Sequence, residues 1–211
     1  NSNDLDLGSG GVVVLPDQPA GSPHQHLLLT AGKTGTIYLI DRDNMGHFNA
    51  ANNGQVVQTL PASMPGIWGT PAWWNNNAYF GGTGEYNHGG DHLKAFHFDA
   101  TTGTFASVPT SQSATLFQYA GTTPSVSANG NTNGIVWALQ VDQFDVSGPA
   151  VLHAYDATNL ATELYISTQN SGRDNPGPAV KFSTPTIANG KVYVGTQNQV
   201  SVFGLLNPPA L

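Results

Sequence analysis

Residues 183–195 read Ser-Thr-Pro-Thr-Ile-Ala-Asn-Gly-Lys-Val-Tyr-Val-Gly, and this stretch contains the features that predict the fold. Proline cannot donate to a sheet ladder, so Pro185 suits the first residue of a strand. The pair Asn189-Gly190 supplies the positive φ angles that a two-residue hairpin needs. The short apolar run after it, residues 191–195, predicts a second strand. The stretch therefore predicts two antiparallel strands joined by a tight turn.

Three features of this stretch and its surroundings recur along the chain. The first feature is Thr-Pro, at Thr70, Thr123 and Thr184. The second is an Asn-containing turn, at Asn76-Asn77, Asn133-Gly134 and Asn189-Gly190, followed by an aromatic residue, Tyr79, Trp137 and Tyr193 respectively. The third is an apolar run that ends in an aspartate, at Asp41, Asp99 and Asp156. Because the three features share one period of about 55 residues, we interpret them as one structural repeat. Each repeat indicates a four-stranded antiparallel sheet, which cannot bury both of its faces alone and must stack on its neighbours.

The repeat predicts an all-β fold, a partial β-propeller of about four four-stranded antiparallel blades in a single domain, residues 1–211. The blades are expected near residues 8–60, 66–115, 117–170 and 180–206. No segment has a convincing 3.6-residue apolar period, so we expect almost no helix. The last blade lacks a fourth strand. We therefore expect the remaining blades of the ring, about seven or eight in all, to come from upstream chain or from a second chain.

The composition restricts the partners and the location of the protein. The net charge is −7, and only six residues are Lys or Arg, with no basic run. This pattern argues against a nucleic-acid or anionic-membrane partner. The absence of cysteine excludes disulfides, thiolate zinc sites and covalent haem within this chain. No apolar run is long enough to predict a membrane span, and the low Lys and Arg content favours a periplasmic or extracellular location.

Residues 70–103 and 183–195 resemble the repeat of pyrroloquinoline-quinone (PQQ) propellers, and the resemblance extends over nearly the whole chain. The same repeat resembles that of non-enzymatic assembly-factor propellers of the bacterial envelope. The resemblance implies a PQQ-like propeller acting as a binding or scaffold module of an exported bacterial protein, with a protein or glycan partner. The alternative that it implies is part of a PQQ-dependent alcohol or sugar dehydrogenase.

The segments 4–8 and 31–42 are similar to the blade of PQQ-dependent alcohol dehydrogenases that carries the catalytic aspartate. The resemblance assigns that role to Asp6, with Asp4 as second choice, and assigns contact with the quinone to Lys33. It implies PQQ and calcium as cofactors: the carboxylate would take the alcohol proton while hydride passes to the quinone. The alternative, which we favour, is that Asp6 and Lys33 belong to a structural blade motif around a Gly-Lys-Thr-Gly hairpin loop.

The connection at residues 81–92, Gly-Gly-Thr-Gly-Glu-Tyr-Asn-His-Gly-Gly-Asp-His, is longer and more polar than its counterparts in the other repeats. Long loops often carry function. Its side chains Glu85, His88, Asp91 and His92 are of the types that hold a divalent metal or a sugar. The plainer interpretation is a solvated Gly-rich loop. Asp142 and Asp145 lie in the matching loop of the third repeat, where they could join the same face and make it acidic. The interpretation that we favour is two exposed turn aspartates.

Three tryptophans, Trp68, Trp73 and Trp74, are candidates for a platform on which a sugar ring stacks. Trp73 and Trp74 are adjacent in a predicted strand, so their side chains point to opposite faces and at least one belongs to the core. The chain has no Gly-x-Ser-x-Gly elbow, phosphate loop or His-Glu-x-x-His motif, so hydrolase and kinase functions have no local support.

Overall fold

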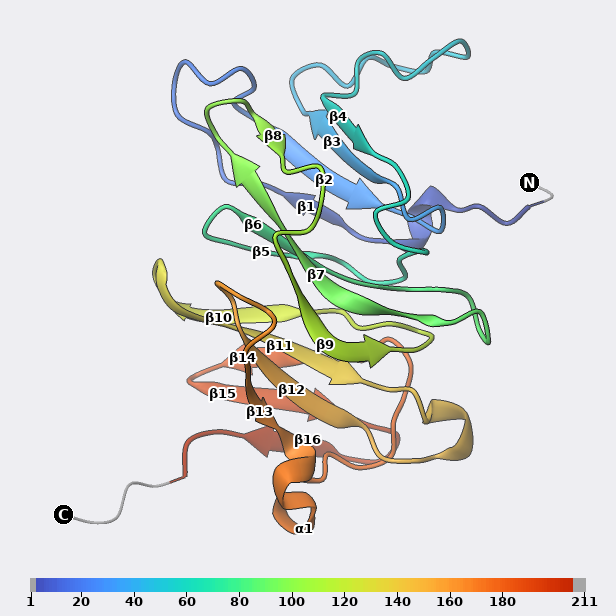
Figure 1. Ribbon diagram of the computed structural model, residues 1–211, viewed down its shortest axis with the longest axis vertical. Helices are drawn as coiled ribbons and strands as arrows, with labels where there is room; N and C mark the ends of the chain where they lie inside the picture. The colour runs from blue at the N-terminus through green and yellow to red at the C-terminus, as the bar shows by residue number, and fades with distance from the viewer. Residues whose placement is uncertain (1–2, 207–211) are drawn as a thin grey trace.

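A computed structural model describes residues 3–206 of the chain. The protein is all-β, with 41% of residues in strands and 7% in helices, and its strands form four antiparallel sheets. The sheets follow one another in chain order from top to bottom in Figure 1. This arrangement confirms the predicted partial propeller.

The sheets contain the following strands. Sheet 1 comprises β1 (Val12–Val14), β2 (Leu27–Ala31), β3 (Ile37–Asp41) and β4 (Gln58–Leu60). Sheet 2 comprises β5 (Ala72–Trp74), β6 (Asn77–Thr83), β7 (Gly90–Asp99) and β8 (Thr104–Phe105), with β9 (Ser111–Phe117) also paired to β7. Sheet 3 comprises β10 (Ser125–Asn129), β11 (Thr132–Gln140), β12 (Val151–Asp156) and β13 (Glu163–Ile166). Sheet 4 comprises β14 (Thr186–Ala188), β15 (Lys191–Gly195) and β16 (Val200–Phe203).

Helical structure in the described part of the chain is limited to short segments of three or four residues, two of which are contiguous. These segments are η1 (Leu7–Ser9), η2 (Phe144–Val146), η3 (Ser167–Asn170) and α1 (Ser171–Asp174). Across residues 3–206, no helix is long and apolar enough to cross a membrane.

The turns of the repeat fall close to their predicted positions, with two shifts. Asn189-Gly190 joins β14 to β15 with positive φ at both residues, as expected. In sheet 2 the turn is at Asn75-Asn76 rather than Asn76-Asn77, because the left-handed pair lies one residue earlier. In sheet 3 the predicted turn at 133–134 is wrong: β11 already begins at Thr132, and β10 and β11 are joined at Gly130 and the residue after it.

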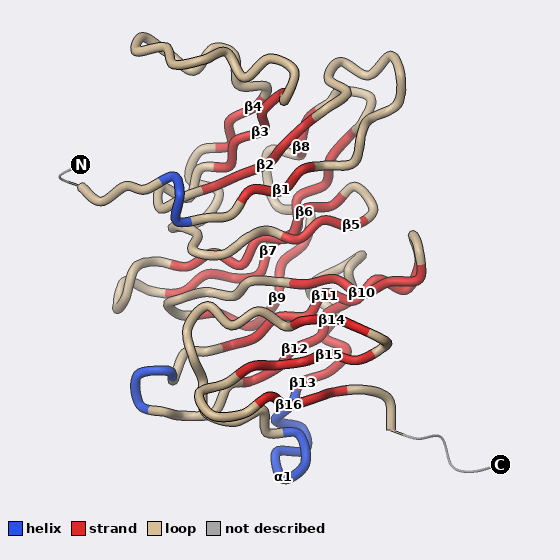
Figure 2. Tube along the Cα trace, turned by 180° about the vertical axis from the view of Figure 1, so that it is seen from behind, coloured by secondary structure: helices blue, strands red, loops and turns tan. Residues whose placement is uncertain are grey.

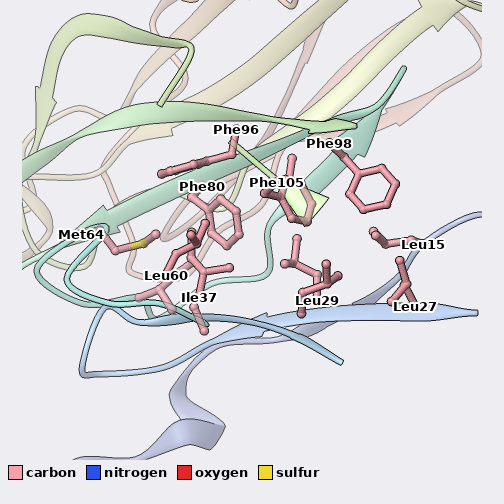
Figure 3. Close-up of a cluster of buried hydrophobic side chains, with 14 residues drawn as sticks. Leu15, Leu27, Leu29, Ile37, Leu60, Met64, Phe80, Phe96, Phe98 and Phe105 are labelled. Carbon is pink, nitrogen blue, oxygen red and sulfur yellow. The ribbon is translucent and has the colours of Figure 1, made fainter. Parts of the chain in front are cut away.

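Apolar side chains fill the space between neighbouring sheets. Figure 3 shows the leucines of sheet 1, among them Leu27 and Leu29, facing Phe80, Phe96 and Phe98 of sheet 2. These five side chains are at most 1% exposed. The period-two geometry of a strand explains the arrangement, because alternate residues of sheet 2 point to opposite faces. Each central strand can therefore serve two interfaces.

Two further cores continue the stack. Tyr79 and Phe117 of sheet 2 pack with Tyr155 of sheet 3, while Leu152 of sheet 3 packs with Val194 of sheet 4. Since Phe117 ends β9, the second sheet extends slightly beyond the range 66–115 expected for that blade. Every sheet that lies between two others is thus buried on both faces, as stacked propeller blades require.

The first strands of successive sheets also contact one another, and Figure 2 shows β1, β5, β10 and β14 following one another along the molecule. The amide of Gly11 donates to the carbonyl oxygen of Gly69 at 3.2 Å, and the Ser125 hydroxyl donates to the Pro185 carbonyl oxygen at 2.5 Å. Pro185 and its counterparts directly precede β5, β10 and β14. Proline suits this position because it cannot take part as a donor in the sheet.

The repeated aspartates stabilise the turns that follow the third strands. Oδ1 of Asp99 accepts from the amide of Thr101, and Oδ1 of Asp156 accepts from the amide of Thr158, each at 2.8 Å. Asp41 makes the same contact two residues ahead. The third feature of the repeat is therefore an Asx-turn, in which a carboxylate replaces a backbone acceptor.

Antiparallel topology places one set of connections at one end of all the sheets. This end carries the segment before β1, the loops β2–β3, β6–β7 and β11–β12, and the links into β5, β10 and β14; we call it the loop face. These loops project to the right in Figure 1. The chain thus brings together residues that are far apart in the sequence.

Candidate functional site

At the first sheet, the loop face carries a lysine held between two aspartates. Nζ of Lys33 lies 2.6 Å from Oδ2 of Asp4 and 3.0 Å from Oδ2 of Asp6. The Lys33 amide also donates to the Asp6 carbonyl oxygen at 3.0 Å, which ties the segment before β1 to the β2–β3 loop. Asp6 and Lys33, to which the resemblance gave separate roles, are therefore in contact, and Asp4 contacts the same ammonium.

The electrostatics of this cluster are those of an ion pair. The Lys33 ammonium holds the pKa of Asp4 below its usual value, chiefly through their hydrogen bond. Contact with the two carboxylates in turn raises the pKa of Lys33. The lysine side chain is only 14% exposed, whereas Asp4 and Asp6 are 76% and 48% exposed. The cation is thus shielded and the anions face solvent.

This arrangement does not fit a quinone and calcium centre. A quinone-contacting cation must direct its donors at the cofactor, but Nζ of Lys33 is directed at two carboxylates. Calcium needs six or more oxygen ligands, and nowhere in residues 3–206 do three or more His, Asp or Glu side chains converge as a metal site. We therefore derive no reaction step from Asp6 and Lys33.

The four residues expected at a metal or sugar site in the second repeat do not converge. Asp91 and His92 lie within β7, so they point to opposite faces of the sheet. Oδ2 of Asp91 pairs with Nζ of Lys94 at 2.7 Å, and Nδ1 of His92 donates to the Thr115 carbonyl oxygen at 3.1 Å.

Of the four residues expected at this site, only Glu85 and His88 lie on a loop. β6 extends to Thr83 and β7 begins at Gly90, so the connection is shorter than the range 81–92. Glu85 and His88 are exposed in it, and the His88 amide donates to the Glu85 carbonyl oxygen at 2.8 Å. The sequence overestimated this loop because its glycines continue into both strands.

A row of aromatic side chains crosses the loop face beside these residues. The ring of Trp68 contacts Tyr119 edge-on at a centroid distance of 5.6 Å. Tyr119 contacts Tyr86 at 5.8 Å and Phe144 at 6.2 Å, and Tyr86 contacts Phe144 at 6.0 Å. These four residues come from the links into β5 and β10 and from the β6–β7 and β11–β12 loops, so we call them the aromatic row.

A lysine and a further aromatic side chain extend the aromatic row towards sheet 4. Nζ of Lys181 lies 5.1 Å from the Phe144 ring centroid and 5.7 Å from that of Tyr119, within cation–π range. The same ammonium lies 5.7 Å from the ring of Phe182. Tyr86 is 47% exposed and Phe182 52% exposed, so the row offers ring surface to solvent.

Polar contacts fix the row in place. The Tyr86 hydroxyl donates to Oδ2 of Asp145 at 2.6 Å, which raises the pKa of Tyr86. Oδ1 of Asp142 accepts from the amide of Gln118, next to Tyr119, at 3.0 Å. Burial raises the pKa of Asp142. Both aspartates lie in the β11–β12 loop, where Asp145 contacts Tyr86 and Asp142 contacts the residue before Tyr119.

The three tryptophans do not form one platform. Trp73 packs into the core between sheets 1 and 2, against Phe98 and Phe105, whereas Trp74 packs into the core between sheets 2 and 3. Their opposite directions follow from their adjacency in β5, as predicted. Only Trp68 belongs to the loop face.

Sequence reasoning missed the aromatic row as a unit, although it left a trace. Tyr86 and Phe144 are 58 residues apart, which matches the spacing between Tyr79 and Trp137. Trp68 and Phe182 each precede a Thr-Pro pair by two residues. The period of the repeat could therefore have predicted that these rings gather at one end.

No known protein family has a model that matches this chain, and the search of curated proteins found no match either. The functional assignment therefore depends on the geometry of the loop face.

Proposed function

We propose that this chain is a propeller-type binding module of an exported bacterial protein and that the aromatic row on the loop face is its ligand-binding surface. The observation that supports the proposal is the row itself. Four successive connections each place a ring there, and the rings of Tyr86 and Phe182 remain about half exposed.

The ligand that we propose for this surface is a glycan. Exposed rings offer flat apolar area, the Lys181 ammonium lies against them, and Asp4 and Asp6 add carboxylates elsewhere on the loop face. Such a mixture of apolar surface and a few placed polar groups is typical of sites for small ligands. The periplasm or the cell exterior, where glycans are abundant, is the compartment we propose.

A glycan array probed with the purified protein tests the proposal. We expect at least one glycan to bind, and the double substitution Tyr86→Ala with Phe182→Ala to abolish that binding. The matched control is Phe48→Ala, since Phe48 is 93% exposed in the β3–β4 loop at the other end of the sheets. Glycan binding that survives the double substitution, or no glycan binding at all, would contradict the proposed function.

A PQQ-dependent dehydrogenase is the alternative that the resemblance implies, although the contacts of Lys33 with Asp4 and Asp6 do not fit a quinone site. Dye-linked alcohol oxidation with added PQQ and calcium tests this candidate. Activity that Asp6→Asn abolishes would support a dehydrogenase. Absence of both turnover and PQQ binding would remove it.

A further inference from the structure

One lysine of the loop face is held by aromatic rings and by no carboxylate. Nζ of Lys181 lies 5.1–5.7 Å from the centroids of three rings, those of Tyr119, Phe144 and Phe182. No ion pair within residues 3–206 includes Lys181, whereas Lys33 on the same face pairs with two aspartates. In this part of the chain, ring faces at cation–π distance are therefore what holds the Lys181 ammonium.

The rings around this ammonium form a site for a cation that does not depend on the lysine. Tyr119 and Phe144 contact each other, and both contact Tyr86, which a hydrogen bond to Asp145 holds in place. Lys181 is exposed, and its flexible side chain can leave the rings without the loss of any strand. Cation–π attraction at an exposed site is modest, so a ligand that brings its own ammonium can take the place of the side chain.

Two carboxylates beside the aromatic row have no cationic partner in the part of the chain that the structure describes. Glu85 directly precedes Tyr86, and Asp145 directly follows Phe144 and accepts from the Tyr86 hydroxyl. Both carboxylates are exposed, and the whole chain carries a net charge of −7. The local field and the overall field therefore both favour a cationic ligand over an acidic one.

We propose that the glycan bound at the aromatic row carries free amino groups, and that a protonated sugar amine replaces the Lys181 ammonium against Tyr119 and Phe144. The sugar ring beside that amine stacks on Tyr86, which contacts both of these aromatic rings. An amino sugar combines an apolar ring face with an ammonium, so it matches both the rings and the carboxylates of Glu85 and Asp145. This inference rests on the proposed glycan-binding function and names the class of glycan.

Two oligosaccharides with the same backbone test the role of the amine. The probes are a glucosamine hexamer and an N-acetylglucosamine hexamer, which differ in their positive charge. Isothermal titration at about pH 5.5 keeps amines protonated and carboxylates ionised. We expect saturable binding of the glucosamine hexamer, at least about fivefold tighter than binding of the acetylated hexamer, because acetylation removes the cation–π and Coulomb attraction.

Substitution of the lysine tests the exchange, because the expected sign is unusual. Lys181→Ala removes the competing ammonium and should strengthen binding of the glucosamine hexamer by about threefold. Lys181→Arg keeps a cation that stacks on rings and should leave the affinity unchanged. Lys191→Ala is the matched control, since Lys191 is also exposed and follows the Asn189-Gly190 turn at the other end of the sheets; it should leave the affinity unchanged.

Two further substitutions test the rings and the carboxylates separately. Phe144→Leu keeps an apolar side chain and removes the ring face, so it should weaken binding of the glucosamine hexamer by about threefold or more. Asp145→Asn keeps an acceptor for the Tyr86 hydroxyl and removes the charge, so it should reduce the preference for the glucosamine hexamer over the acetylated one. Circular dichroism and the urea midpoint of each variant must match those of the parent protein, and the comparison of the two hexamers needs no substitution.

The results that would overturn this inference differ from those that would overturn the proposed function. Equal affinity for the two hexamers, weaker binding after Lys181→Ala, or equal affinity for a lysine hexamer would overturn the amino-sugar assignment. If a neutral or acidic glycan then binds in a manner that depends on Tyr86 and Phe182, the glycan-binding function still holds. Absence of binding to every glycan would overturn both.

Discussion

The buried hydroxyl of Tyr79 in sheet 2 donates a hydrogen bond of 2.7 Å to the carbonyl oxygen of Ala157, directly after the third strand of sheet 3. Both residues are at most 2% exposed. The bond joins one aromatic position of the repeat to the Asx-turn of the next repeat. It therefore connects two of the features that predicted the fold, across the interface that their stacking creates.

Removal of this hydroxyl should destabilise the stack. Tyr79→Phe leaves a buried carbonyl oxygen without its partner, which costs about 1–3 kcal/mol. Urea unfolding followed by fluorescence measures the change in free energy of unfolding. Tyr193→Phe, at the equivalent position in sheet 4, is the control and should change it by less than about 0.5 kcal/mol. Equal effects of the two substitutions would contradict the role of the Tyr79 bond.

A second link joins the outer strands of sheets 1 and 2. The Gln58 side chain accepts from the Phe105 amide at 2.7 Å and donates to the Phe105 carbonyl oxygen at 2.9 Å. Gln58→Ala leaves both backbone groups without these bonds, so we expect a loss of about 1–3 kcal/mol in urea unfolding. Gln112→Ala, an exposed glutamine of β9, should be nearly neutral. A neutral Gln58→Ala would mean that water replaces the amide at no cost.

The Asx-turns predict how stability depends on acid. Asp41, Asp99 and Asp156 each have a pKa below the usual value of 3.8. The main causes are the hydrogen bond with His24 for Asp41, the Thr101 amide for Asp99 and the Thr158 hydroxyl for Asp156. As the pH falls, the aspartates of the unfolded chain therefore take up protons before those of the folded protein. The stabilisation is fully present above pH 3.8 and is lost as the pH falls through the lower pKa values of the folded state.

Urea titrations from neutral pH down to about pH 3 measure this loss. Asp156→Asn keeps an acceptor for the turn but does not titrate, so it should reduce the acid dependence while leaving the stability at neutral pH nearly unchanged. Asp156→Ala removes the acceptor and should lower stability at neutral pH. If the free energy of unfolding of the Asp156→Asn protein falls with pH as steeply as that of the parent protein, the Asp156 carboxylate does not contribute to the loss of stability in acid.

The ion-pair cluster on the loop face gives a local prediction. Lys33→Met keeps most of the length of the shielded side chain and removes the ammonium, so the pKa of Asp4 should rise towards 3.8. Carbon-detected NMR titration of the aspartates measures it. Asp99, whose pKa is lowered by the Thr101 amide instead, is the internal control and should keep its titration. An unchanged Asp4 titration would mean that the contact with Lys33 is absent in solution.

The sequence predicted those strands that carry a long apolar or alternating pattern, such as residues 191–195, which form β15. It did not predict β8, which has two residues, or β9, whose polar sequence disguises a buried Ser113 that bonds to the backbone of Leu93 and Thr115. Strands of this kind are fixed by pairing with β7 rather than by their own pattern.

Only part of the candidate site could be predicted from the sequence. Lys33 and Asp6 were singled out by the family resemblance, and the structure places the two side chains in contact although they are 27 residues apart. Tyr86, Tyr119 and Phe144 come from separate connections, so only the stacking of the sheets brings them together. Asp91 and His92 were grouped with Glu85 and His88 because one loop was expected over residues 81–92, but β7 begins at Gly90 and a strand separates adjacent side chains.

The stacked sheets bring the connections of sheets 2 and 3 together on one loop face. Aromatic NOE spectroscopy of the selectively labelled protein tests it most directly. We predict cross-peaks among the rings of Tyr86, Tyr119 and Phe144, whose centroids lie 5.8–6.2 Å apart, and loss of the Tyr86 peaks in Tyr86→Ala. Sharp ring signals without cross-peaks between Tyr86 and Phe144 would contradict the stacking and the binding surface that depends on it.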